Sequence, residues 1–167
     1  FTVWRYDRPH DGVLRLWLNT GAPGNIVTHE NHHEFGTVWP AVAADPETRV
    51  VLVRGVDGVL SRGGDMTFMP PMLDDPRRRA AVHDDIRNLV INMLNCPKPI
   101  ITAIEGHCSG GGLAMALMAD IPVAARSATI IDAHHYAGVA CGDHAAMAWP
   151  LLMGMAKAKY HLLAAKD

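Results

Sequence analysis

Residues 98–113, which read KPIITAIEGHCSGGGL, join a short apolar segment to three consecutive glycines. The apolar run Ile100–Ile104 has the length and composition of a strand inside a parallel sheet. Gly110, Gly111 and Gly112 then offer backbone N–H groups where a helix begins, and such groups can bind a developing negative charge. A second glycine-rich loop, residues 58–65, follows the apolar segment 50–53. The two strand–loop pairs predict a mainly parallel α/β fold.

Neither glycine loop has the spacing of a nucleotide-binding motif. The triple glycine is not followed by Lys-Ser or Lys-Thr, as a Walker loop requires, and G-x-G-x-x-G spacing is missing. Two converging N–H donors, one from each loop, would instead make an oxyanion hole. The alternative is that the glycines only permit tight turns, and the pattern leaves it open.

The rest of the chain supplies the other elements of a single domain over residues 1–167. Strands are expected at 2–6, 13–18, 123–125 and 129–132, and a turn at 10–12 joins the first two. One helix is expected to begin with Asn31 as its N-cap and to end at Asp45, and a longer one runs from Asp75-Pro76 to residue 96. A third helix follows the triple glycine, and the end of the chain is expected to be helical with a kink at Pro150. The segment 133–144 lacks periodicity and predicts a loop.

Composition restricts the class of protein. The 167 residues are 49% hydrophobic with a net charge of -2, and no basic run predicts nucleic-acid binding. No apolar run is long enough to span a bilayer. Three cysteines without C-x-x-C spacing favour reduced thiols, so we expect a cytoplasmic protein.

The two motifs together resemble the crotonase (enoyl-CoA hydratase/isomerase) superfamily. The resemblance rests on VLVRG (51–55), LSRGGD (60–65), KPIITAIEG (98–106), GGG (110–112) and ADI (119–121). It implies an α/β, crotonase-like ββα spiral fold, with oxyanion-hole amides at Arg62 and Gly111. It also implies a homotrimer or a dimer of trimers. Family members continue through C-terminal helices that are missing after Asp167, so the chain is either a fragment or completed by a partner surface.

Three positions depart from the hydratases of that family. One catalytic Glu is replaced by Ala114, and the other aligns with His134. The Lys that helps bind CoA phosphates is replaced by Thr67, so we expect weak CoA binding. The resemblance therefore implies a poor enoyl-CoA hydratase.

The loop HHYAGVACGD (134–143), with Trp149-Pro150 after it, is similar to the 6-oxocamphor hydrolase branch, which cleaves β-diketones. This similarity implies His134 as general base, Asp143 as its partner and His32 as a further active-site residue. Trp39, His135 and Trp149 would line the pocket of a small carbonyl substrate. Neutral imidazole suits a base near pH 7, and an enolate leaving group would suit the oxyanion hole. No cofactor and no metal are expected.

Three alternatives stay open. The chain could be an acyl-CoA-acting crotonase, such as a hydratase/isomerase, lyase or thioesterase. It could hold a metal, because His29, His32 and His33 would share a helix face that His134, His135, His144 and Cys141 could join. It could also be a non-catalytic assembly subunit.

Overall fold

Two sheets and a set of helices form the computed structural model, which describes residues 1–142, 144–164 and 166, without the side chains of 68–70. The strands are β1 (Trp4–His10), β2 (Val13–Leu18), β3 (Val50–Gly55), β4 (Ser61–Arg62), β5 (Ile100–Ile104), β6 (His107–Ser109), β7 (Ile121–Ala124) and β8 (Thr129–Ile130). The α-helices are α1 (Glu34–Ala44), α2 (Met69–Asp74), α3 (Pro76–Leu94), α4 (Gly110–Met118), α5 (His144–Met153) and α6 (Met155–Ala164). Short 3-10 helices are η1 (Val56–Gly58), η2 (Met66–Phe68) and η3 (His134–Ala137).

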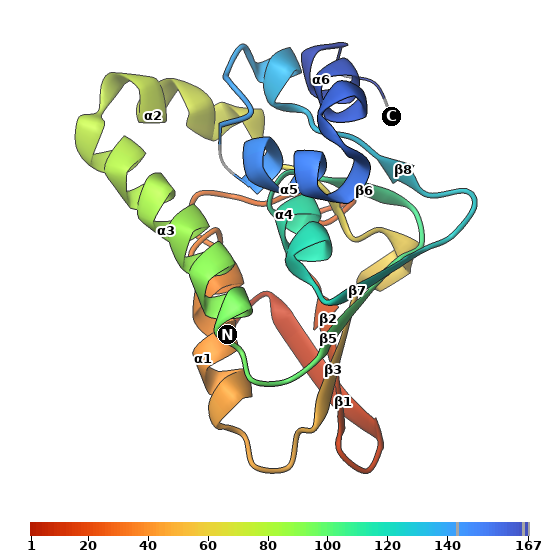
Figure 1. Ribbon diagram of the computed structural model, residues 1–167. Helices are drawn as coiled ribbons and strands as arrows, with labels where there is room; N and C mark the ends of the chain where they lie inside the picture. Colours follow the sequence, from red (N-terminus) through yellow and green to blue (C-terminus); the bar gives the residue numbers. More distant parts are fainter. Residues whose placement is uncertain (143, 165, 167) are drawn as a thin grey trace.

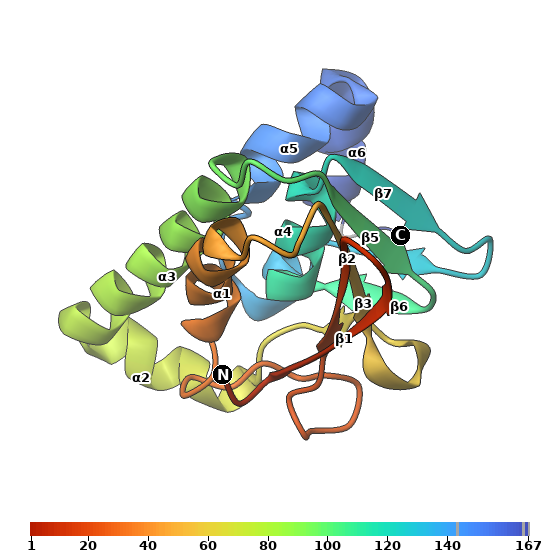
Figure 2. The ribbon, with the colours of Figure 1, turned by 90° about the horizontal axis from the view of Figure 1, so that it is seen from below.

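The larger sheet has the strand order β1-β2-β3-β5-β7. β1 and β2 form an antiparallel hairpin, and the other pairs are parallel. Every second residue of β2, β3 and β5 is buried, so these strands present one apolar face to the core. Helices α1 and α3 lie side by side, and α4 lies between the sheet and α5 (Figures 1 and 2).

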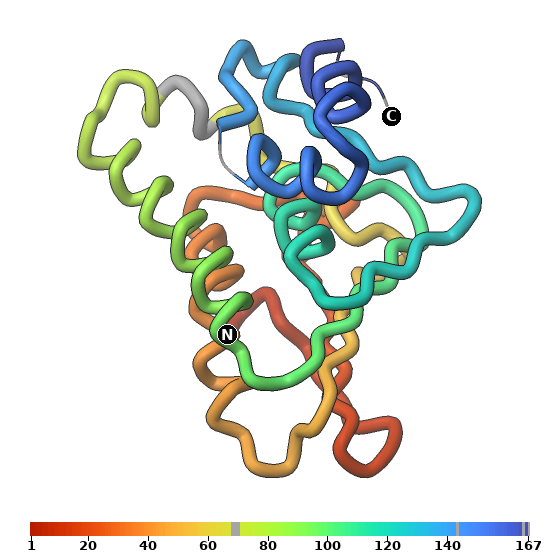
Figure 3. Tube along the Cα trace, viewed as in Figure 1, coloured from red at the N-terminus to blue at the C-terminus, as the bar shows by residue number. Residues whose placement is uncertain are grey.

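The smaller sheet has the order β4-β6-β8, and all of its strands are parallel. Ser61 pairs with Cys108, and Cys108 pairs with Ile130. α5 and α6 fold back over this part of the molecule, where α5 contacts α4 and α6 contacts η3 (Figure 3). Because the three strands run in the same direction, their carboxyl ends meet at one edge.

Several predicted helix ends need correction. α1 begins at Glu34 with His33 as N-cap, whereas Asn31 accepts a hydrogen bond from the Thr28 amide (2.9 Å) and makes the turn before the helix. Pro150 lies inside α5, and the break falls instead at Gly154, which has a φ of +81°. α3 does start as predicted, since Asp75 accepts from the Arg77 amide at 2.8 Å. Among the described residues, no helix is long and apolar enough to cross a membrane.

Candidate active site

The carboxyl ends of the smaller sheet deliver three loops to one edge. β4 leads into Gly63 and Gly64, β6 leads into α4, and β8 leads into Asp132 and η3. The Ile131 amide continues the ladder by donating to the Cys108 carbonyl at 3.2 Å. Ligand sites in parallel α/β structures commonly lie outside the carboxyl ends of strands. This edge is therefore the candidate active site.

The Arg62 amide is already occupied. It donates to the carbonyl of Gly24 at 2.9 Å, which ties β4 to the loop before α1. The same loop is anchored by Asn25, whose carbonyl accepts from the Ser61 hydroxyl at 2.9 Å. An amide that donates within the fold cannot also stabilise a substrate oxyanion. The prediction of Arg62 as an oxyanion-hole donor is therefore wrong for this structure.

Gly64, two residues further on, presents its amide on the side of the chain away from Val27. It forms an isolated parallel bridge with Val27, in which the Val27 amide donates to Gly63 (2.9 Å) and the Asp65 amide donates to Val27 (2.8 Å). Backbone groups of neighbouring residues in an extended chain point to opposite sides. The Gly64 N–H therefore points away from Val27.

The second donor loop touches the first. A Cβ placed on Gly110 would lie 2.7 Å from the Cα of Gly63 and 3.3 Å from the nitrogen of Gly64. Gly110 has a φ of +57°, so the backbone at this junction needs glycine. Gly111 lies in the first turn of α4, where amides have no intrahelical acceptor. The amides of Gly64 and Gly111 thus belong to two loops in direct contact.

His134 is held by a buried aspartate that the sequence analysis missed. Its Nδ1 lies 2.9 Å from Oδ1 and 3.0 Å from Oδ2 of Asp132, whose side chain is only 1% exposed. The His134 amide also donates to Asp132 Oδ1 at 3.1 Å. An Asp that bonds the backbone two residues on is a common turn motif, so the sequence D-A-H was the available signal.

The other predicted catalytic side chains have different positions. Asp143 lies outside the described residues. His32 precedes α1, and its Nδ1 lies 3.1 Å from Oδ2 of Asp85 in α3; its catalytic role stays a prediction. His135 is exposed on η3 beside His134.

The two tryptophans belong to the hydrophobic core. Trp39 is fully buried, and its Nε1 donates to the Phe35 carbonyl at 2.9 Å, so its predicted place in a substrate pocket is corrected to a core role. Trp149 is 3% exposed and packs against His161 with ring centroids 5.9 Å apart. Its contribution to substrate binding stays a prediction.

Groups near the edge differ in reactivity. Ala114 is buried in α4 and brings no acid or base. Burial raises the pKa of the Cys108 thiol to about 12, so this cysteine is not a nucleophile. Burial also lowers the pKa of His107, and the positive charge of Arg62 adds to that effect. Arg62 itself is exposed, so its guanidinium can reach a ligand although its amide cannot.

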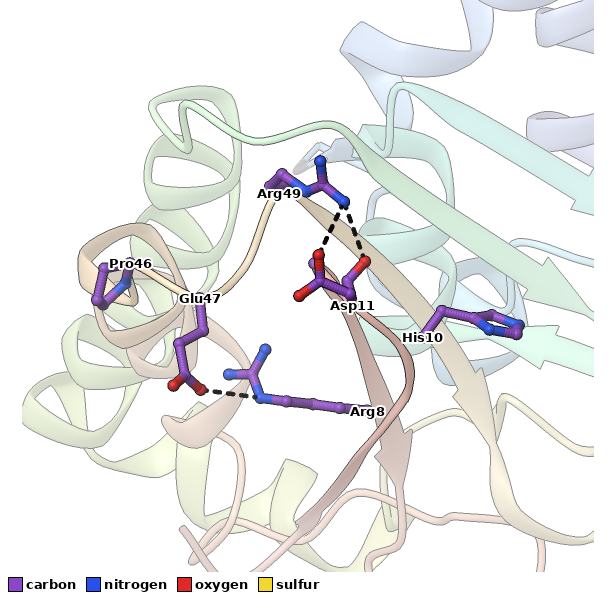
Figure 4. A pocket seen from close by; sticks show the side chains of 7 residues that line it. Arg8, His10, Asp11, Pro46, Glu47 and Arg49 are labelled. Carbon is purple, nitrogen blue, oxygen red and sulfur yellow. Dashed lines mark hydrogen bonds and ion pairs between the residues drawn. The ribbon is translucent and has the colours of Figure 1, made fainter.

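Two surface depressions were found near charged residues. One, of about 330 Å³, adjoins the glycine-rich loop 58–65 and is lined by Thr28, His29, Glu30, Asp65, Thr67, Pro71 and Arg78. The other, of about 550 Å³, lies at the amino ends of β2 and β3 (Figure 4), where Arg8 pairs with Glu47 and Arg49 with Asp11. Its arginines are neutralised by neighbouring acids, and it is remote from the edge with the three loops. Within the described ranges, no three His, Cys, Asp or Glu side chains lie together as metal ligands would.

Comparison with known proteins identifies the family and the fold of the chain. The family model for enoyl-CoA hydratase/isomerase matches residues 8–167. Mouse mitochondrial methylglutaconyl-CoA hydratase is 27% identical over 98% of this chain, and Escherichia coli 1,2-epoxyphenylacetyl-CoA isomerase is 29% identical over 88%. The chain covers 52% and 57% of these two proteins, so it spans about half the length of the curated relatives it matches.

A solved enoyl-CoA hydratase/isomerase from Mycobacterium paratuberculosis superposes with a TM-score of 0.90 at 26% identity, over 99% of this chain and 66% of that one. The predicted crotonase-like fold is thereby confirmed, whereas closeness to the 6-oxocamphor hydrolase branch finds no support in these matches. With its paired glycine loops and its nearly complete match to the family model, this chain belongs to the enoyl-CoA hydratase/isomerase family.

Proposed function

We propose that this chain carries the enolate-forming part of an enzyme that acts on acyl-CoA thioesters. The close approach of Gly110 to the Gly63–Gly64 backbone carries the proposal, because it brings together the two loops to which the proposed donors belong. A thioester oxygen that becomes negative as the α-proton leaves would accept from Gly64 and Gly111. One such donor commonly changes kcat by about 10²–10³. The relatives whose names include a CoA ester support this substrate class.

His134 is the proposed base. Residues 131–133 join β8 to η3, so His134 belongs to the loop that leaves the same edge of the small sheet as the two donor loops. Ala114 leaves α4 without a carboxylate, so the proton transfer would depend on this one imidazole. A single base is sufficient for isomerisation, decarboxylation or thioester hydrolysis, whereas hydration commonly uses two groups in this family.

Exchange of the α-proton of a thioester in D2O tests the proposal directly, because it requires only a base and an oxyanion hole. We expect the protein to exchange the α-protons of acyl-CoA esters. His134→Ala should lower the exchange rate by about 10²–10⁴, the usual worth of a general base. The matched control is His135→Ala, since His135 is exposed on the same turn and should change the rate less than threefold or so. Equal losses in the two variants would contradict the assignment.

A second candidate is cleavage of a β-diketone. The Asp132–His134 pair favours it, because a histidine oriented by a carboxylate can activate water for attack on a carbonyl. Water would add to one carbonyl while His134 takes its proton, and the tetrahedral intermediate would collapse with cleavage of the C–C bond. The amides of Gly64 and Gly111 would hold the enolate that leaves until His134 returns the proton to carbon. A cyclic 1,3-diketone belongs in the same assay. Cleavage of the diketone without exchange on any thioester would replace the first candidate by the second.

A further inference from the structure

Asp132 is a buried carboxylate with one side-chain partner in the structure as described, the ring of His134. Both of its oxygens lie within 3.0 Å of Nδ1, and Oδ1 also accepts from the His134 amide. A carboxylate can only accept hydrogen bonds when it is ionised, so Nδ1 must carry the hydrogen. The neutral ring then has its lone pair on Nε2.

We infer that Asp132 is the positioning residue of this site, and that it fixes the tautomer in which His134 accepts the substrate proton at Nε2. The inference rests on the proposed function, in which His134 is the base, and it specifies which ring nitrogen of that base takes the proton. In the forward step, Nε2 would take the α-proton while the electron pair moves to the thioester oxygen. The imidazolium that forms would be stabilised by the Asp132 charge, and the proton would return from Nε2 to carbon.

The backbone makes this arrangement rigid relative to the oxyanion loops. Ile131, the residue before Asp132, donates to Cys108 in the central strand β6, and β6 continues through Ser109 into the helix that carries Gly111. The base and one amide donor are thus anchored to adjacent strands. The ring of the buried His144 in α5 lies against the His134 ring, with centroids 6.1 Å apart, and α6 contacts η3.

Nitrogen NMR of the histidine rings tests the inference without any substrate. His134→Gln identifies the His134 signals by their loss. In the unmodified protein near pH 8, we expect His134 as the Nδ1–H tautomer. Asp132→Asn should shift the tautomer population of His134 toward Nε2–H, while His135→Gln should leave that population unchanged. An Nε2–H tautomer in the unmodified protein would overturn the inference even if the Asn variant did not fold.

Kinetics on the same variants separates this inference from the proposed function. Asp132→Asn should lower kcat for α-proton exchange by about 10²–10⁴ and leave KM within about threefold, as loss of an orienting carboxylate does elsewhere. A normal kcat in a folded Asp132→Asn variant would refute the positioning role and leave the proposed function intact. If the unmodified protein exchanged the α-protons of no thioester, the proposed function would fail. The tautomer measurement would still decide whether Asp132 holds the His134 ring as its Nδ1–H form.

Discussion

Gly110→Ala should separate the two amide donors. The new Cβ would lie 2.7 Å from the Cα of Gly63, whereas carbon atoms in contact need about 3.5–4.0 Å. The loops must therefore move apart by about 1 Å, a displacement that can cost about 10²-fold in rate. Alanine at a φ of +57° also costs about 1–2 kcal/mol of stability. We expect kcat for α-proton exchange to fall about 10²-fold in a protein that still folds.

Gly154→Ala is the matched control. Gly154 has a φ of +81° and no atom within 4 Å of an added Cβ, so this variant carries the same backbone strain without the contact. It should lose a similar amount of stability in urea titrations and keep its exchange rate. If folded Gly110→Ala exchanged α-protons at the unmodified rate, the two loops would not be the oxyanion hole. Equal rate losses in both variants would show that strain alone lowers activity.

Two further predictions concern charged side chains. Hydrogen bonds from Thr48 and Arg8 lower the pKa of Asp45 to about 2, so the stability that Asp45 contributes is present above its unfolded-state pKa and is lost as the pH falls toward about 2. Urea midpoints measured from about pH 5 to 2 should therefore fall less steeply for Asp45→Asn than for the unmodified protein; parallel curves would contradict this. Arg62→Ala should raise KM for an acyl-CoA about five- to tenfold, through loss of a contact worth about 1 kcal/mol, and leave KM for the same acyl N-acetylcysteamine thioester unchanged. Exposed Arg77→Ala is the control, and equal effects on both substrates would show that Arg62 does not contact the CoA portion.

The fold was largely predictable because the central strands of its larger sheet are rich in apolar residues and its loops are rich in glycine. Segments such as Ile100–Ile104 and the helix start at Asp75-Pro76 depend on local patterns, which a single sequence displays directly. The triple glycine likewise predicted the start of α4.

The partners within the site were harder to predict, because they depend on register. The Arg62 amide differs from that of Gly64 only in which neighbouring segment it faces, and this follows from contacts with Gly24 and Val27 some 40 residues earlier. Asp132 was not predicted as a site residue because it closes the extended segment 129–132, where an aspartate is easily interpreted as the polar end of a strand. Trp39 was placed in a pocket because aromatic residues suit both pockets and cores, and only packing distinguishes the two.

The small sheet β4-β6-β8 joins segments that lie far apart in the chain, although each strand is only two or three residues long. Closing such long loops costs conformational entropy before the few ladder bonds can compensate for it, so we expect these contacts to form late during folding. The helices and the hairpin β1–β2, by contrast, depend on neighbours in sequence. A chain with only those elements formed would still lack any structured place for a developing negative charge.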